Sequence, residues 1–122
     1  MPAWISILGC TGSIGRNALD VVRHHPGRFE VLALAAHSNV NLLEQQVREF
    51  KPRYAVVANV DAVDKMPDLG PDVTVLTGPQ GLVEAAALDV DTALCAVVGA
   101  AGLYPVLEAI DAAKQVAIAN KE

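Results

Sequence analysis

The feature that most constrains this chain is a glycine turn near its start, residues 9–15, with the sequence GCTGSIG. An apolar run, residues 5–8, precedes the turn, and apolar side chains at helical spacing follow it. This order predicts a strand, a tight turn and a helix. Gly9 can leave the strand in a left-handed conformation that costs other residues about 1–2 kcal/mol. Gly12 leaves room for a phosphate, and Gly15 lets the helix lie close to the sheet. The apolar helical positions are Ile14, Ala18, Leu19, Val21 and Val22.

The start of the predicted helix is a candidate anion site. Its first N–H groups have no partner within the helix, and the helix dipole favours a negative charge there by about 0.3–1 kcal/mol. A pyrophosphate would satisfy both, and the hydroxyls of Thr11 and Ser13 add donors. A tight turn in another α/β protein, without a ligand, is the alternative.

Composition narrows the class of protein. The 122 residues suit one domain, and 52% apolar with only 4% aromatic residues favours parallel strands covered by helices. A net charge of −5 argues against nucleic acid or an anionic membrane as a partner. No apolar run reaches the roughly 18 residues of a membrane helix and no signal peptide is visible, so we expect a cytoplasmic protein. Cys10 and Cys95 lack metal-ligand spacing. We interpret Cys10 as a small turn residue; a thiol with a lowered pKa is the alternative.

Apolar runs and turn residues divide the rest of the chain into alternating strands and helices. We expect an α/β fold: a Rossmann-like, doubly wound, parallel six-stranded sheet with helices on both faces, in the order 3-2-1-4-5-6. Residues 59–72 are predicted to form a short helix or loop without chemistry. The expected strands cover residues 5–8, 29–36, 54–58, 73–76, 93–98 and 116–119, and the later helices lie near residues 41–50, 79–88 and 103–110.

The loop after the second strand is the place where such folds read the adenosine ribose. Here it holds His37, Ser38 and Asn39, with no acidic side chain to accept from a ribose 2′-hydroxyl. Hydroxyl, amide and imidazole groups suit a 2′-phosphate instead, and an ordinary polar loop is the alternative. Asn41 and Glu44 have the spacing of a capping box at the start of the next helix.

Two other stretches invite a functional interpretation. His24 and His25 are adjacent, so on a helix they point in different directions, and we expect a solvated surface rather than a metal site. Residues 99–102, GAAG, form a small turn at the end of the fifth strand, where α/β sheets bind ligands. Close helix packing without a ligand is the alternative there.

Five stretches together resemble the N-terminal domain of 1-deoxy-D-xylulose 5-phosphate reductoisomerase over essentially all 122 residues. The resemblance implies an NADPH-dependent oxidoreductase that makes 2-C-methyl-D-erythritol 4-phosphate in the non-mevalonate isoprenoid pathway, with a divalent metal, Mg or Mn, and a homodimer through regions outside this chain. The stretches are LGCTGSIG at 8–15, LDVVRH at 19–24, PRYAV at 52–56, VGAAGL at 98–103 and ANKE at 119–122.

The resemblance also implies roles for single residues. Thr11, Gly12, Ser13 and Ile14 would contact the pyrophosphate, and His37, Ser38 and Asn39 would form the 2′-phosphate loop. Asn120 and Glu122 would touch the cofactor, and Lys121 would stand between cofactor and substrate. Family members often have glycine, and some lysine, where this chain has His37 and Ser38. The chain therefore departs from the family at the residues that would set the affinity for the 2′-phosphate.

The resemblance places the metal-binding carboxylates and the substrate phosphate site beyond residue 122. We therefore expect residues 1–122 to be a dinucleotide-binding domain that holds no catalytic or metal-binding residue and is inactive alone. A stand-alone nucleotide-binding or scaffold module is one alternative, and the N-terminal domain of another NADP-dependent dehydrogenase is a second. The Asn-Lys-Glu ending favours the enzyme, because a scaffold has no need for it.

Overall fold

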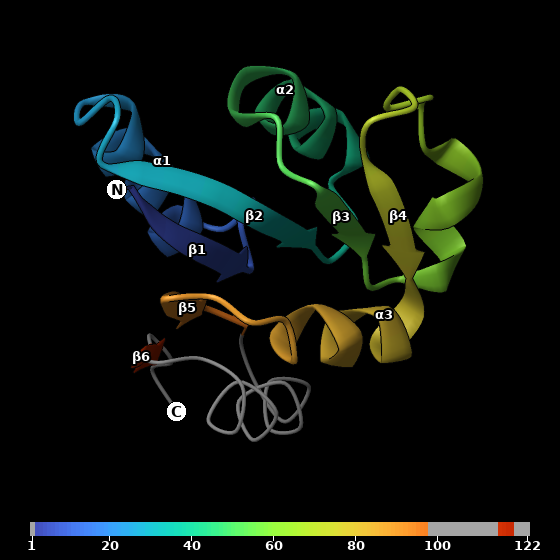
Figure 1. Ribbon diagram of the computed structural model, residues 1–122. Coiled ribbons are helices and arrows are strands. Elements are labelled where there is room, and N and C mark those ends of the chain that lie inside the picture. The colour runs from blue at the N-terminus through green and yellow to red at the C-terminus, as the bar shows by residue number, and fades with distance from the viewer. Residues whose placement is uncertain (1, 98–114, 119–122) are drawn as a thin grey trace.

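The computed structural model describes residues 2–97 and 115–118. Strands and helices alternate along these ranges, with one 3-10 helix, η1, between the third and fourth strands (Figure 1). The elements are β1 Ala3–Leu8, α1 Ser13–Arg23, β2 Phe29–Ala36, α2 Val40–Phe50, β3 Tyr54–Val57, η1 Val60–Lys65, β4 Thr74–Thr77, α3 Gly78–Ala86, β5 Thr92–Cys95 and β6 Gln115–Ile118.

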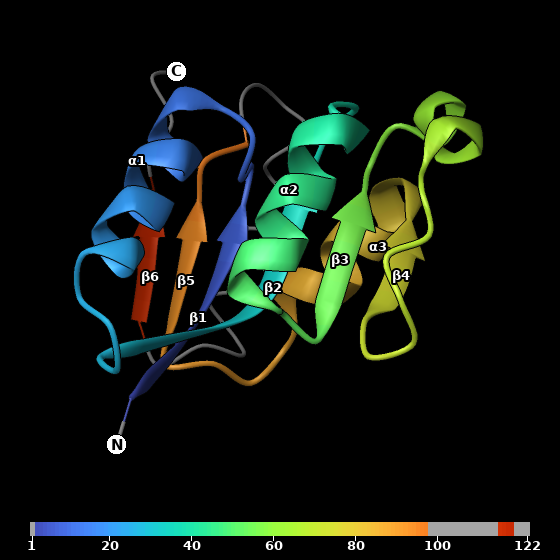
Figure 2. The ribbon, with the colours of Figure 1, turned by 90° about the horizontal axis from the view of Figure 1, so that it is seen from above.

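All six strands are parallel and form one sheet in the order β4-β3-β2-β1-β5-β6. The parallel six-stranded sheet is confirmed, but the expected order is wrong: β4 lies at the edge beside β3, and β5 takes the place beside β1 (Figure 2). The difference arises from residues 59–72, which contain η1 and connect β3 to β4 at the edge of the sheet. The chain then returns to the centre through α3, which packs against β1 to β4 and leads to β5 beside β1.

Helices cover both faces of the sheet, as expected. One core contains the buried side chains of α1 and α2, with Ala62 of η1, against Ile7, Leu34 and Val57. The other contains α3 against Leu8, Ala35 and Val56. Figure 1 shows α1 and α2 on one side of the strands and α3 on the other. Alternate residues of β1, β2, β3 and β5 therefore face opposite cores, which explains their continuous apolar runs.

Two local expectations are wrong. Of the apolar positions predicted for the first helix, Leu19 is buried in the core as expected, but Val21 is 52% exposed. The capping box at Asn41 does not form, because α2 begins earlier: Asn39 is its N-cap and its Oδ1 accepts from the Leu42 N–H at 3.2 Å. Glu44 pairs instead with Arg48, one turn further on.

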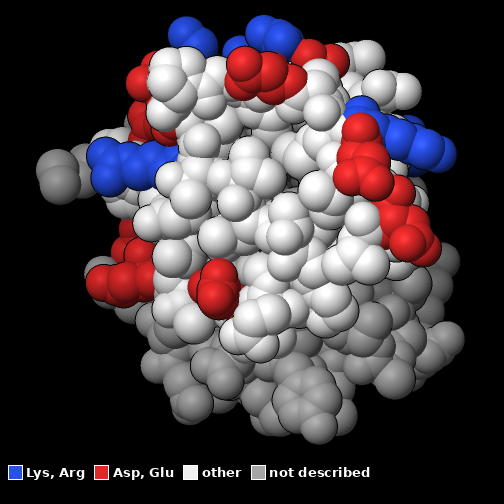
Figure 3. All heavy atoms as spheres, turned by 90° about the vertical axis from the view of Figure 1, so that its right-hand side faces the viewer, with Lys and Arg blue, Asp and Glu red and all other residues white. Residues whose placement is uncertain are grey.

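The edge of the sheet formed by β4 carries exposed apolar side chains. Val75 of β4 and Val60 of η1 are 41% and 60% exposed. In Figure 3 uncharged side chains occupy the centre of this side of the molecule, and charged ones lie mostly around it. Within the described ranges, each helix is too short or too polar to traverse a lipid bilayer.

Candidate functional site

The glycine turn lies at the carboxyl end of the central strand β1. Two successive N–H groups, of Gly9 and Cys10, donate to the Ala35 carbonyl of β2 at 2.8 and 2.9 Å. On the other side, the Ala96 N–H after β5 donates to the Leu8 carbonyl at 2.8 Å. The chain runs outward from β1 through β2 on one side and through β5 on the other. The turn therefore sits where the strand order reverses, the usual ligand position in such sheets.

The three glycines of the turn have different surroundings. Gly9 has a φ of +95°, and a Cβ there would stand 2.6 Å from the Ala96 carbonyl oxygen. A Cβ on Gly15 would stand 2.2 Å from the carbonyl oxygen of Gly9. Among the described residues, a Cβ on Gly12 would meet only that same oxygen, at 3.7 Å. Gly9 and Gly15 are thus required by protein packing, whereas the space at Gly12 is open to a ligand.

The N-terminus of α1 faces this open space. Gly12 is the N-cap, no side chain in the described ranges caps the helix, and its first turn holds no acidic residue. The first N–H groups of the helix, beginning with Ser13, therefore have no capping partner in the described part of the chain. Gly12 and Ser13 are exposed, and Thr11 and Ile14 are partly buried. This arrangement fits a pyrophosphate.

The loop after β2 ends at the same edge of the sheet as the glycine turn, since β1 and β2 are parallel neighbours paired up to Leu8 and Ala35. His37, Ser38 and Asn39 are all exposed. The Asn59 N–H donates to the His37 carbonyl at 2.8 Å, which ties the loop to the end of β3. Because the Asn39 oxygen caps α2, its side-chain NH₂ is left as the donor. The structure thus brings both halves of the predicted cofactor site to one edge.

Sequence reasoning missed two side chains at the turn. Gln46 of α2 is buried, and its Nε2 donates to the Cys10 carbonyl at 2.9 Å. The signal was present: Gln46 falls between Leu43 and Val47 on the apolar face of a helix, where a polar residue is unexpected. Arg16 is the second; its Nε lies 3.4 Å from the Gly12 carbonyl oxygen, so a guanidinium lies beside the turn.

Cys10 is a structural residue of the turn. Burial raises the pKa of its thiol to about 12, so the thiol stays neutral at physiological pH. This overturns the alternative of a reactive thiolate, because the cost of burying the charge outweighs the favourable effect of the backbone hydrogen bond.

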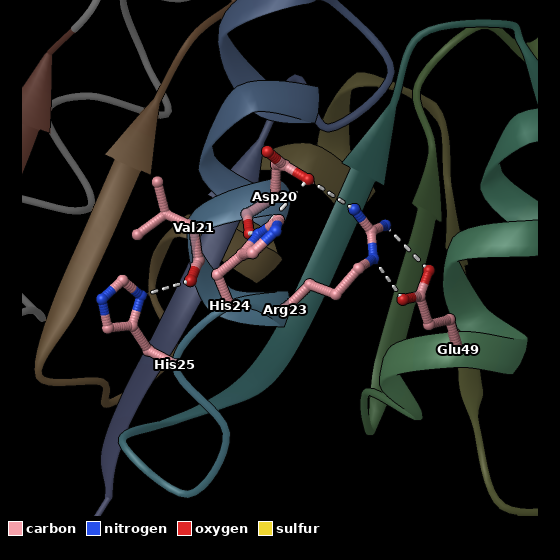
Figure 4. A network of polar contacts seen from close by, with 6 residues as sticks. All are labelled: Asp20, Val21, Arg23, His24, His25 and Glu49. Carbon is pink, nitrogen blue, oxygen red and sulfur yellow. Dashed lines mark hydrogen bonds and ion pairs between the residues drawn. The ribbon is translucent and has the colours of Figure 1, made fainter.

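The histidines end α1 rather than bind a metal. The Nδ1 atoms of His24 and His25 lie 2.7 and 2.8 Å from the carbonyl oxygens of Asp20 and Val21, one turn back (Figure 4). Both side chains are exposed. Among the described residues, no group of three His, Cys, Asp or Glu could hold a metal ion. The described part of the chain therefore does not fit the divalent metal that the resemblance implies.

Some predicted features lie outside the described residues. These are the small turn at residues 99–102, the helix near residues 103–110, and Asn120, Lys121 and Glu122. The roles assigned to Asn120, Lys121 and Glu122 stay predictions.

Comparison with known proteins bears directly on this site. A relative from Thermodesulfovibrio yellowstonii, a 1-deoxy-D-xylulose 5-phosphate reductoisomerase, is 46% identical over 119 residues, 97% of this chain and 31% of the relative's length. A chloroplastic relative of that name from Oryza sativa subsp. japonica is 45% identical over 99% of this chain and 27% of its own length. The chain thus spans about a third of the length of the curated relatives it matches.

Solved structures agree with the sequence relatives. The Zymomonas mobilis reductoisomerase in complex with NADPH superposes with a TM-score of 0.93 at 36% identity, over 99% of this chain and 32% of that one. A reductoisomerase with NADPH, fosmidomycin and magnesium gives a TM-score of 0.88 at 40% identity, over 98% of this chain and 30% of that one. The family model for 1-deoxy-D-xylulose 5-phosphate reductoisomerase matches residues 5–122. The family model, the sequence relatives and the solved structures agree, and the chain belongs to the 1-deoxy-D-xylulose 5-phosphate reductoisomerase family.

Proposed function

We propose that residues 1–122 are the NADPH-binding domain of a reductoisomerase that converts 1-deoxy-D-xylulose 5-phosphate to 2-C-methyl-D-erythritol 4-phosphate. The observation that carries the proposal is the open space at Gly12, in front of the uncapped N-terminus of α1 and at the centre of the sheet. Relatives whose structures contain NADPH share this fold. When bound, NADPH supplies the hydride for the reduction.

The residues of this chain bind and orient the cofactor. Thr11, Ser13 and Ile14 flank Gly12 in the turn and at the start of α1, and we propose that their N–H groups hold the pyrophosphate. Ser38 and the Asn39 amide would donate to the 2′-phosphate, and His37 adds a charge when protonated. The roles that we propose for Asn120 and Glu122 at the cofactor and for Lys121 at the substrate rest on the resemblance alone.

This chain matches only about a third of the length of its relatives. We propose that the divalent metal site, the catalytic groups and the homodimer contacts lie in the part of the enzyme that corresponds to the rest of that length. Both cysteines are free in the described residues, which suits a reducing compartment such as the cytoplasm.

Titration calorimetry with NADPH and NADH tests the assignment. No Arg or Lys lies in residues 37–39, so the 2′-phosphate meets neutral donors. Hydrogen bonds from neutral donors to a charged phosphate contribute about 1.5–3 kcal/mol each, and no ion pair with Arg or Lys in this loop adds to them. We therefore expect this chain to bind both cofactors and to prefer NADPH modestly. Equal affinities would refute the 2′-phosphate loop, and the absence of binding would refute the cofactor domain.

A further inference from the structure

A glutamine side chain buried between α2 and the glycine turn has no role in the site so far. Gln46 is only 6% exposed, and its neighbours on the helix, Leu43 and Val47, belong to the core. Its Nε2 donates to the Cys10 carbonyl at 2.9 Å, across 36 positions of sequence. A carbonyl oxygen can only accept, so the amide nitrogen is the atom that must face the turn.

The two polar atoms of the Gln46 amide differ in their pairing. The Oε1 of Gln46 is buried and has no hydrogen-bond partner among the described residues. An unpaired buried acceptor is unfavourable, and the hydrogen bond that offsets this cost is the one that Nε2 donates to the Cys10 carbonyl. The effect of this glutamine is therefore exerted through its donor, on the turn.

The donor fixes the orientation of one peptide group. The described residues contain no cis peptide bond, so the Cys10 carbonyl and the Thr11 N–H share one plane and point in opposite directions. Because Gln46 holds the carbonyl toward α2, the Thr11 N–H is directed away from α2. No acceptor within the described part of the chain is paired with this N–H. It is thus available at the turn where the pyrophosphate would bind.

The same helix also carries the loop for the 2′-phosphate. Asn39 is the N-cap of α2, and Gln46 follows about 10 Å further along the helix axis. We propose that Gln46 is a positioning residue, which orients the Cys10–Thr11 peptide for the pyrophosphate and holds the turn in register with the 2′-phosphate loop. This inference rests on the proposed function as a cofactor domain.

The test compares Gln46→Met with Gln45→Met in the 122-residue chain. Methionine keeps the length of the side chain but removes the donor, and Gln45 is an exposed neighbour on the same helix. Titrations use NADPH and 2′-AMP, which carries the 2′-phosphate but no pyrophosphate. We expect Gln46→Met to bind NADPH about five- to tenfold more weakly, the value of one hydrogen bond, and to bind 2′-AMP as the wild type does. Gln45→Met should match the wild type with both ligands.

Each other outcome has a definite meaning. If Gln46→Met binds NADPH as tightly as the wild type, the inference is wrong and the proposed function stands. An equal loss for NADPH and 2′-AMP would show a general structural role and would also overturn it. If the wild type binds no NADPH, the proposed function fails, and the inference fails with it. Melting curves report folding, and Gln46→Leu, which also removes the donor without adding a charge, replaces the methionine variant if that one does not fold.

Discussion

At the scale of single residues, Gly12 and Gly15 share a motif but differ in what surrounds them. Gly12 has a φ of −77° and a ψ of 174°, which valine adopts readily, and the space beside it is open. We expect Gly12→Val to abolish NADPH binding without unfolding, because its side chain occupies the space of the pyrophosphate. Calorimetry together with circular dichroism checks this. Unchanged affinity in a native variant would remove the pyrophosphate assignment.

Gly15 provides the matched control for that substitution. A Cβ there would lie 2.2 Å from the Gly9 carbonyl oxygen and 2.6 Å from the Cys10 Cα, both backbone atoms. Overpacking of this kind costs about 1–3 kcal/mol or more. Gly15→Ala should therefore lower the melting temperature, whereas Gly12→Val should leave it nearly unchanged.

Asn39 has two functions that a single substitution can separate. Its Oδ1 caps α2, and aspartate caps a helix as well as asparagine does. A carboxylate, however, would repel a 2′-phosphate and accept a hydrogen bond from a ribose 2′-hydroxyl. We expect Asn39→Asp to keep its stability, to lose about tenfold or more in NADPH affinity and to bind NADH better.

Paired titrations of NADPH and NADH measure this switch. Gln45→Glu adds the same charge to an exposed position of the same helix and should leave the preference unchanged. If Asn39→Asp retained the wild-type preference for NADPH, Asn39 would not face the 2′-phosphate.

At the scale of elements, the pairing of α1 with α2 depends on apolar packing and on one ion pair. Arg23 of α1 donates to Glu49 of α2, with Nη2 2.9 Å from Oε1 (Figure 4). Its guanidinium also lies over the Phe50 ring. The hydrogen bonds from Arg23 lower the pKa of the Glu49 carboxyl, helped by the charge of Arg23. Both side chains are about half exposed, at 46% and 44%, so solvent screens the pair and its contribution is small.

The lowered pKa gives this contribution a definite pH dependence. A carboxyl with a lowered pKa in the folded state stabilises the fold above its ordinary pKa, and the contribution is lost as the pH falls through the lowered value. Glu49→Gln should therefore be slightly less stable than the wild type at pH 7, and the difference should vanish in acid. Urea unfolding midpoints at pH 7 and pH 3 check this. A difference that grew in acid would contradict the assignment.

At the scale of the whole molecule, the described residues include the proposed cofactor site, and no group of three His, Cys, Asp or Glu among them could hold a metal ion. We expect the 122-residue chain to bind NADPH and yet not oxidise it in the presence of 1-deoxy-D-xylulose 5-phosphate and Mn²⁺. The reason is that substrate positioning and metal-ion stabilisation supply most of the rate in such chemistry. Absorbance at 340 nm reports the cofactor, and steady oxidation above background would overturn the expectation.

The sequence by itself determined the glycine turn, the alternation of strands and helices, and the apolar faces. These follow from local chemistry: a left-handed φ at Gly9 needs glycine, and a strand covered on both faces, such as β2, needs a continuous apolar run. The motifs shared with the family added the expected cofactor, NADPH, to what local chemistry predicts. The position of the loop at residues 37–39 could be predicted as well, since it depends only on where the second strand ends; its role at a 2′-phosphate stays a prediction.

Tertiary structure decided what depends on distant segments. Residues 59–72 have no clear periodicity, so only packing shows that η1 carries the chain outward to place β4 beyond β3. The cap at Asn39 formed two residues before the expected one, because α2 begins at Val40. Gln46 reaches Cys10 only because α2 packs beside the turn, and no local pattern encodes a contact across 36 positions.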